Sequence, residues 1–217
     1  MVDRMIILIT IGLVFIFLLN LFIYWIIFQK VKDKNKELVR LFYKIFPIIW
    51  IVTLITIPII NSSLLRAFFP ENSSYFDDYW NLFALLGITF IIIGINFAKR
   101  GRKRYRIMST DEKVSKLITS GIYRIIRHPT YSGWVIIFLG AALISDSLTS
   151  LILCPIIYFI LEFHALIEEK LILIPKYGEK YEKFKKKTPY RIIPTPLNFF
   201  LIILVFIIVY MGFINVN

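Results

Sequence analysis

The chain has 217 residues, 58% of them hydrophobic, and a formal net charge of +12 at pH 7. Its mean hydropathy of +0.74 comes from long apolar blocks, whereas a soluble domain interleaves apolar and polar residues at helix or strand spacing. Cys154 is the single cysteine, which excludes an intrachain disulfide, and with only two histidines we expect no metal site.

The first apolar block, residues 6–28, contains no charged residue, and the second, residues 41–60, contains only Lys44. Crossing about 30 Å of hydrocarbon takes about 20 helical residues, and backbone polar groups in lipid must be satisfied within the segment. Both blocks are therefore predicted to be transmembrane helices. The first is longer than the apolar core of a signal peptide and no small-residue cleavage site follows it, so we expect it to be retained.

Four further spans are predicted at residues 81–98, 131–145, 148–163 and 197–213. The second and third of these are short and separated only by Asp146 and Ser147, which predicts a tight helical hairpin. Pro155 is expected to bend the second helix of the hairpin, because proline removes a backbone donor and crowds the preceding turn. The fold class predicted is an all-α integral membrane protein with about six transmembrane helices.

Basic residues predict the orientation of these spans. Residues 29–40 hold five Lys or Arg, residues 99–130 hold ten and residues 164–196 hold eight, whereas residues 61–80 hold only Arg66. Six spans place the three basic segments on one face, and the positive-inside rule makes that face cytoplasmic. Topology and anionic headgroups account for the net charge, so no nucleic-acid partner is expected.

Most of the polar residues that could form a functional site lie in residues 109–133 and 162–194, on either side of the hairpin. Taken singly, each feature has an ordinary explanation. Arg127 and His128 before Pro129 are typical of a helix start, Glu168 and Glu169 of a solvated helix end, and residues 176–187 of an amphipathic helix on the membrane surface.

The order and spacing of these features together resemble a known family. Residues 117–133 read Leu-Ile-Thr-Ser-Gly-Ile-Tyr-Arg-x-x-Arg-His-Pro-x-Tyr-x-Gly, and the hairpin is followed by Glu-Glu, Tyr-Gly-x-x-Tyr and Arg-x-x-Pro. This pattern, over roughly residues 114–194, is similar to the superfamily of isoprenylcysteine carboxyl methyltransferases and phospholipid methyltransferases. The resemblance implies a membrane enzyme that transfers a methyl group from S-adenosylmethionine to a lipophilic acceptor, either prenylated or phospholipid-like.

The resemblance also implies roles for individual residues. The adenosine half of the cofactor would lie against Leu117, Ile118, Gly121 and Tyr123, and its methionine end against Arg127, His128 and Pro129. Glu169 would take the ammonium group, with Glu168 as the alternative because the spacing allows a shift of one residue. The aromatic ring beside the sulfonium would be Tyr123 or Tyr131, and Arg191 would bind an anionic acceptor. The residues expected at the reacting groups are thus Glu168, Tyr131 and Arg191.

Two positions depart from the isoprenylcysteine methyltransferases. These enzymes tend to have a histidine two positions ahead of the pair matched by Leu117 and Ile118, where this chain has Ser115. They also tend to have an arginine four residues before the cofactor glutamate, where this chain has Ala165 or His164, depending on which glutamate is matched. These departures leave the cofactor interpretation standing and weaken the prenylcysteine interpretation.

Two alternatives to a methyltransferase remain open. Membrane sterol reductases resemble this superfamily in their C-terminal helices, and the basic run at residues 99–106 would suit the 2′-phosphate of NADPH. A channel or transporter component is the second alternative, although the spans hold few ionisable groups. We expect three functional regions: membrane helices with a basic loop (1–108), a catalytic region (109–196) and a last transmembrane helix (197–217), with the active site facing the cytoplasm.

Overall fold

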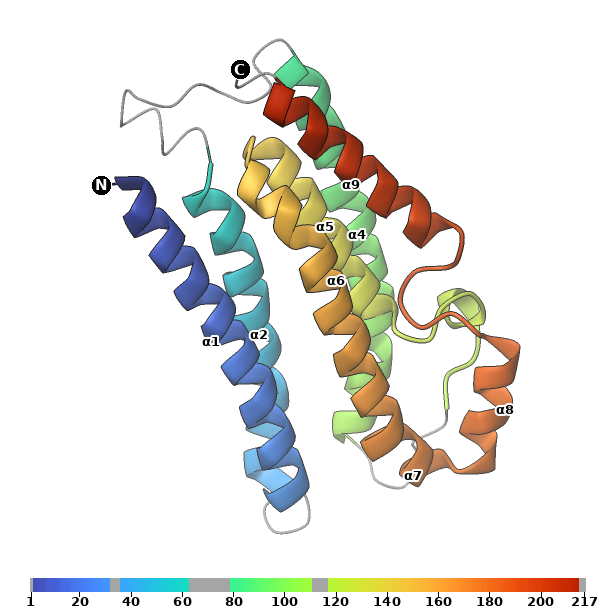
Figure 1. The fold of residues 1–217 in the computed structure, drawn as a ribbon. Helices are drawn as coiled ribbons and strands as arrows, with labels where there is room; N and C mark the ends of the chain where they lie inside the picture. The colour runs from blue at the N-terminus through green and yellow to red at the C-terminus, as the bar shows by residue number, and fades with distance from the viewer. Residues whose placement is uncertain (1, 32–35, 63–78, 111–116, 215–217) are drawn as a thin grey trace. The chain divides into compact units, whose positions relative to one another are not determined.

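The structure is a computed structural model that describes residues 2–31, 36–62, 79–110 and 117–214, and all regular secondary structure within these segments is helical (Figure 1). The chain divides into two compact units, Met1–Asn72 and Ser73–Asn217. The candidate site lies entirely in the second unit. This division differs from the functional boundaries at 108/109 and 196/197, which stay a prediction.

The first unit pairs helix α1 (Val2–Val31) with helix α2 (Lys36–Ile60). Two polar contacts join them: the Trp50 indole N–H donates to Asn20 at 2.6 Å, and the Asn61 amide donates to the Thr10 hydroxyl at 2.8 Å. Hydrogen bonds of this kind hold helices together where lipid surrounds them, since lipid offers no competing partner. Much of the remaining apolar surface of this unit is exposed, as a lipid-facing surface would be.

The second unit is built from α4 (Trp80–Thr110), α5 (Pro129–Ile144), α6 (Leu148–Glu168) and α9 (Leu197–Ile214). The predicted hairpin is confirmed: α5 and α6 are antiparallel neighbours joined only by residues 145–147 (Figure 1). At the turn, the Ser147 hydroxyl accepts a hydrogen bond from the Ser150 backbone N–H at 3.2 Å and so caps α6. The helix α6 then continues through Pro155 to Glu168.

Glycines bring α4 and α5 into close contact. A Cβ atom on Gly94 would lie 2.7 Å from the Gly133 carbonyl oxygen, and a Cβ on Gly87 would lie 2.6 Å from the Gly140 carbonyl oxygen. Gly101 meets the backbone of Thr130 in the same way. Only residues without a Cβ allow helix backbones to approach this closely. The start of α5, where the Arg-His-Pro motif lies, is therefore held directly against α4.

The chain after α6 turns back toward the start of α5. A π-helical turn (Glu169–Leu173) leads into the short helix α7 (Ile174–Tyr177), and Gly178, at φ +52°, provides the sharp turn into α8 (Glu179–Lys187). Tyr181 and Phe184 of α8 are buried within the protein, so these two aromatics do not face lipid as an amphipathic surface helix would require.

The chain is an α-helical membrane protein. Among the described residues, three helices are long and apolar enough to cross a bilayer, over Ile6–Trp25, Trp80–Gly101 and Leu148–Tyr177. Three shorter apolar helices, Ile48–Ile60, Pro129–Ile144 and Leu197–Tyr210, account for the other predicted spans. All six predicted spans are thus helical, while the number of crossings and the cytoplasmic orientation stay predictions.

Candidate functional site

The Arg-His-Pro segment and the segment after α8 are joined through their backbones. The backbone N–H of Arg127 donates to the Tyr190 carbonyl at 3.0 Å, and the N–H of His128 donates to the Arg191 carbonyl at 2.9 Å. The Ser132 hydroxyl, one turn into α5, donates to the Ile192 carbonyl. Residues 188–192, about sixty positions later in the sequence, are therefore fixed against the start of α5.

The buried side chain of Arg127 links the start of α5 to Glu169 and to the segment after α8. Its Nη1 donates to the carbonyl oxygens of Thr188 (2.5 Å) and Pro189 (2.7 Å), and its Nε donates to Glu169 Oε1 at 2.7 Å. The residue is only 3% exposed. A buried guanidinium is stable only where its donors are satisfied, and these three acceptors come from two separate segments of the chain.

The Glu169 carboxylate is the common acceptor of three cationic side chains. Besides Arg127, its Oε1 lies 3.1 Å from His128 Nε2, and its Oε2 lies 3.4 Å from Arg191 Nε. Arg191 also forms an ion pair with Glu162, two turns earlier on α6. The π-helical turn begins at Glu169 and widens the helix at this point, a feature that often occurs at functional sites.

Glu168 has a different set of partners. Its Oε2 accepts a hydrogen bond from the Tyr131 hydroxyl at 2.7 Å and lies 3.4 Å from His128 Nδ1. The rings of His128 and Tyr131 are nearly parallel, with 6° between their planes and 5.4 Å between centroids. The His164 ring also packs against Tyr131, at 65° and 5.3 Å between centroids. We refer to Arg127, His128, Tyr131, Glu168, Glu169 and Arg191 as the polar cluster.

The polar cluster favours the charged form of His128. Burial alone would lower the pKa of its imidazole, but the hydrogen bonds and charges of Glu168 and Glu169 outweigh that effect and raise the pKa above its ordinary value. Both ring nitrogens face carboxylates, which suits an imidazolium with two N–H donors.

A hollow of about 250 Å³ opens beside the polar cluster. Its wall combines a guanidinium, an imidazolium, a carboxylate and two phenol rings with the backbone of α4 at Gly101, whose carbonyl accepts a hydrogen bond from the Tyr123 hydroxyl at 2.8 Å. The lining residues are Gly101, Tyr123, Arg127, His128, Pro129, Thr130, Tyr131 and Glu168. Such a wall offers both anion-binding and cation-binding groups within one small volume.

The structure brings together most of the residues singled out in the sequence. Six of them line the hollow, namely Tyr123, Arg127, His128, Pro129, Tyr131 and Glu168, while Glu169 and Arg191 belong to the polar cluster without lining the hollow. By contrast, Leu117, Ile118 and Gly121 do not line the hollow. Gly121, at φ +64°, instead begins the 3₁₀ turn that carries Tyr123.

Sequence reasoning missed four contributors: Gly101 and Thr130 in the wall of the hollow, Thr188 as a partner of Arg127, and Glu162 as a partner of Arg191. The sequence carried a signal for Gly101, because Gly87, Gly94 and Gly101 recur every seven residues along one face of α4. Ser115, where the pattern departs from the isoprenylcysteine methyltransferases, lies outside the described residues.

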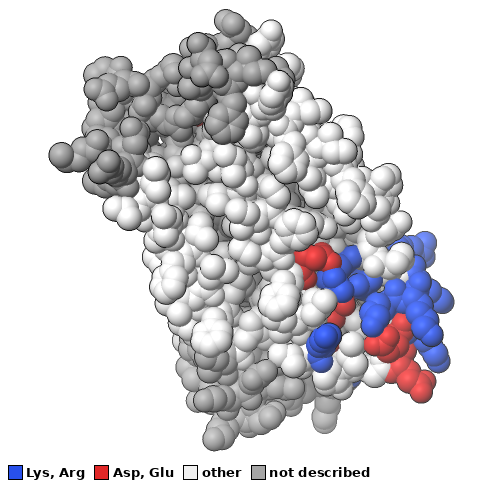
Figure 2. All heavy atoms as spheres, viewed as in Figure 1, with Lys and Arg blue, Asp and Glu red and all other residues white. Residues whose placement is uncertain are grey.

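Basic side chains surround this end of the second unit. Figure 2 shows Lys and Arg gathered around α8, with a few carboxylates among them, whereas most of the described surface over the membrane helices is uncharged in this view. Lys180, Lys183, Lys186 and Lys187 are exposed on α8. The polar cluster thus lies at the boundary between the apolar and the charged parts of the unit.

Known proteins are similar to this part of the chain. Residues 82–180 match the family model described as phospholipid methyltransferase. A protein-S-isoprenylcysteine O-methyltransferase from Schizosaccharomyces pombe is 30% identical over 38% of this chain and 35% of its own length. A probable enzyme of the same name from Oryza sativa subsp. indica is 28% identical over 55% of this chain and 63% of its own length.

A Δ(14)-sterol reductase from Candida albicans is 36% identical over 37% of this chain, which is 18% of the reductase. The chain therefore spans less than two thirds of the length of these curated relatives, and no solved structure matches it. The family match begins inside α4, which the sequence motifs did not reach, and includes the hairpin and both glutamates. This part of the chain is similar to phospholipid methyltransferases and to isoprenylcysteine methyltransferases.

Proposed function

We propose that the chain is an integral membrane methyltransferase that transfers a methyl group from S-adenosylmethionine to a lipophilic acceptor at the cytoplasmic boundary of the bilayer. The observation that carries the proposal is the hollow beside the buried polar cluster, in which cationic, anionic and aromatic groups converge within the family-matched region. A water-soluble donor and a membrane-dissolved acceptor can meet only at such a boundary.

The charged and aromatic side chains that line the hollow suit S-adenosylmethionine. The methionine end of that cofactor carries a carboxylate, which suits His128 and Arg127, and an ammonium group, which suits a carboxylate at the wall. Glu168 lines the hollow, whereas Glu169 is held behind it by three cations, so we assign the ammonium group to Glu168. The Tyr123 ring also lines the hollow and offers a π-face to the sulfonium cation.

When bound, S-adenosylmethionine supplies an electrophilic methyl group, and the protein's task is to align and shield it. Methyl transfer is a direct displacement, so orientation and exclusion of water should provide most of the rate enhancement. Tyr131 is suited to orienting the cofactor because it is itself held in place. Its hydroxyl donates a hydrogen bond to Glu168, and its ring packs against His128 and His164. Glu169 acts as a positioning residue, because it holds Arg127, His128 and Arg191 together behind the hollow.

Arg191 is the group we assign to the acceptor. Its side chain is 22% exposed, whereas those of Arg127 and Glu169 are 4% and 5% exposed, so it is the more accessible of the two arginines in the polar cluster. A guanidinium binds a carboxylate or phosphate in a two-point geometry. An acceptor with such a group can replace Glu162 as the partner of Arg191 and place its reacting atom at the mouth of the hollow.

The second candidate function is an NADPH-dependent reductase. The similarity to the Candida albicans sterol reductase favours it. Exposed Lys99 and Arg100 at the end of the α4 span would lie near a cofactor phosphate. The match covers only a small part of that enzyme, and the hollow's paired ammonium- and carboxylate-binding groups suit an amino-acid moiety better than a nicotinamide.

Ligand-dependent thermal stability separates the two candidates. The full chain in detergent is heated with S-adenosylmethionine, S-adenosylhomocysteine or NADPH at matched excess. A ligand at about 100 times its Kd stabilises the native state by about 2.7 kcal/mol. We expect both adenosyl ligands to raise Tm and NADPH to leave it unchanged. A rise with NADPH alone would favour the reductase, and no rise with any ligand would refute cofactor binding.

A further inference from the structure

Two segments of the second unit meet at the surface next to the hollow. The Thr188 hydroxyl, directly after α8, donates to the Tyr123 carbonyl at 3.2 Å and lies 3.5 Å from the Arg124 carbonyl oxygen. The 3₁₀ turn (Gly121–Arg124) therefore lies beside the end of α8 (Figure 1). Five exposed residues flank this contact along the two segments, and we call them the boundary patch: Arg124, Ile125, Lys186, Lys187 and Pro189.

The cations of the boundary patch are not neutralised by neighbouring carboxylates. Within the segments that the structure describes, no ion pair engages Arg124, Lys186 or Lys187. Two other lysines of α8, by contrast, pair with glutamates of the same helix. Three positive charges are therefore available to an anion from outside the protein. A guanidinium matches a phosphate in a two-point geometry, and an ammonium group adds a point charge.

Both segments of the boundary patch lead into apolar helices. Helix α5 begins four residues after Ile125, and helix α9 begins eight residues after Pro189. At the start of α9 the side chains of Phe199 and Phe200 are exposed, as side chains that face lipid would be. The boundary patch therefore lies where an apolar surface gives way to a charged one.

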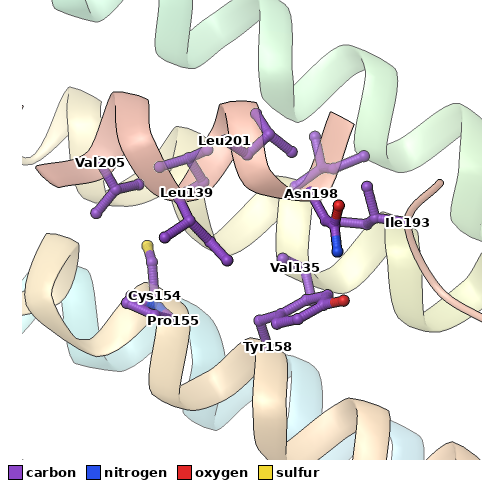
Figure 3. Close-up of a pocket in the computed structure, with 11 residues that line it drawn as sticks. Val135, Leu139, Cys154, Pro155, Tyr158, Ile193, Asn198, Leu201 and Val205 are labelled. Carbon is purple, nitrogen blue, oxygen red and sulfur yellow. The ribbon is translucent and has the colours of Figure 1, made fainter. Parts of the chain in front are cut away.

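The protein itself holds the boundary patch in place. On one side, α8 is anchored by the buried rings of Tyr181 and Phe184. On the other side, the first turns of α9 face the hairpin, where Asn198 and Leu201 lie across from Tyr158 (Figure 3) and the Tyr158 side chain hydrogen-bonds Asn198. Because the aromatic rings of α8 are used inside the protein, contact of this region with a membrane depends on its cations and on Ile125.

The composition and position of the boundary patch favour a lipid surface over a soluble anion. A single exposed isoleucine or lysine is ordinary on any protein surface. Here three cations adjoin Ile125, which is 58% exposed, close to the ends of apolar helices. In a bilayer the phosphate groups lie directly above the acyl chains, so one lipid can meet both kinds of side chain. An anionic leaflet also attracts basic residues that lie near its surface.

We infer that the boundary patch binds the phosphate groups of anionic phospholipids in the adjacent leaflet, with Ile125 at the edge of the acyl chains. This inference goes beyond the proposed function, because no step of methyl transfer uses the five residues of the patch. Arg124 directly follows Tyr123, which lines the hollow. Binding therefore holds this wall of the hollow at the level of the head groups, where a membrane-dissolved molecule arrives.

Photo-crosslinking tests the inference on the full chain, in nanodiscs made of equal parts phosphatidylcholine and phosphatidylglycerol. The probe is phosphatidylglycerol with a diazirine on its head group, and the control probe is phosphatidylcholine with a diazirine at the same place. We expect the anionic probe to label peptides that contain Ile125 and Pro189 about tenfold more than the zwitterionic probe does. Equal labelling by the two probes, or labelling confined to other basic segments, would overturn the inference without relying on any variant.

Two double variants with the same change in net charge separate the boundary patch from general attraction. Arg124→Gln with Lys187→Gln should lower labelling by the anionic probe about tenfold and leave labelling by the zwitterionic probe unchanged. The matched control is Lys176→Gln with Lys180→Gln, at exposed positions in α7 and at the start of α8. Lys180 lies about 10 Å from Lys187 along the helix axis, so the control should retain the labelling. Equal losses in both double variants would show attraction by net charge alone and would overturn the patch.

Added salts separate a lipid surface from a soluble phosphate ligand in the same assay. Sodium chloride and sodium phosphate at matched ionic strength should lower the labelling equally, because screening shortens the range of the attraction from about 10 Å at 0.1 M to about 3 Å at 1 M. A much larger loss with phosphate would assign the patch to a soluble anion and overturn the lipid assignment. None of these readouts requires S-adenosylmethionine, so the result is independent of the proposed function.

Discussion

At the scale of single residues, the balance of charge within a buried cluster organises the site. Glu162, Glu168 and Glu169 face the cations Arg191, His128 and Arg127, so the group is neutral only while His128 carries a proton. Charges removed from water are tolerated only in such compensated arrangements. The two adjacent glutamates have different roles. Glu169 pairs with side chains of the protein itself, and Glu168 faces the hollow.

The first prediction concerns this division. Glu169→Gln should lower the stability of the ligand-free protein by about 3–5 kcal/mol, the usual cost of breaking a buried ion pair, because three cations lose their common acceptor. Glu168→Gln should instead mainly weaken stabilisation by S-adenosylhomocysteine. Thermal scans of the two isosteric variants, with and without ligand, make the comparison. The reverse pattern would assign the cofactor's ammonium group to Glu169.

The second prediction is a pH dependence. Because the folded pKa of His128 is raised, its imidazolium contributes stability that is fully present below the unfolded pKa of about 6.5 and is lost as pH rises through the higher folded value. Between pH 6.5 and 9, Tm of the wild type should therefore fall relative to that of His128→Gln. Parallel pH profiles for the two proteins would show that His128 is not charged in the native state.

At the scale of elements, close packing of α4 on α5 makes the wall of the site. The glycines at 87, 94 and 101 let α4 approach the start of α5, which places the Gly101 carbonyl within 2.8 Å of the Tyr123 hydroxyl. The 3₁₀ turn that holds Tyr123 is in turn linked to the segment after α8, since the Thr188 hydroxyl donates to the Tyr123 carbonyl at 3.2 Å.

The third prediction tests this packing. Gly133→Ala would place a Cβ 2.5 Å from the Gly94 carbonyl oxygen and 2.6 Å from the Ala98 backbone nitrogen. Overpacking of this kind costs about 1–3 kcal/mol, so Tm should fall and donor binding should weaken as the wall shifts. Gly12→Ala is the control, because a Cβ there meets nothing within 4 Å. Equal stability of the two variants would refute a tight α4–α5 contact.

The sequence predicted the elements better than the contacts between them. Long apolar blocks and the Asp146–Ser147 break were enough to place six helices and the hairpin, because backbone hydrogen bonding in lipid leaves few alternatives. The amphipathic pattern of α8 was ambiguous between a lipid surface and a protein surface. Burial of Tyr181 and Phe184 resolves it, and that depends on partners far away in the sequence.

At the scale of the whole molecule, the two compact units differ in what they contribute. The unit formed by residues 73–217 contains the polar cluster and the hollow, while the unit formed by residues 1–72 contains a helix pair with a largely apolar surface. The motifs around the hairpin implied that Arg127 and Glu169 bind the same end of one cofactor, and Arg127 Nε lies 2.7 Å from Glu169 Oε1. The motifs did not predict that α4 forms part of the wall of the hollow, because α4 contributes glycines and backbone atoms to that wall.

The most direct test of the proposed function is methyl transfer itself. The purified chain in nanodiscs is incubated with S-adenosylmethionine labelled in its methyl group and a membrane lipid extract that includes prenylated and single-chain anionic lipids. We expect label to enter the organic-soluble fraction with the wild-type chain, and to fall at least tenfold with Glu168→Gln. Wild-type protein that S-adenosylhomocysteine stabilises but that transfers no label to any lipid or prenylated acceptor would contradict a methyltransferase with a lipophilic acceptor.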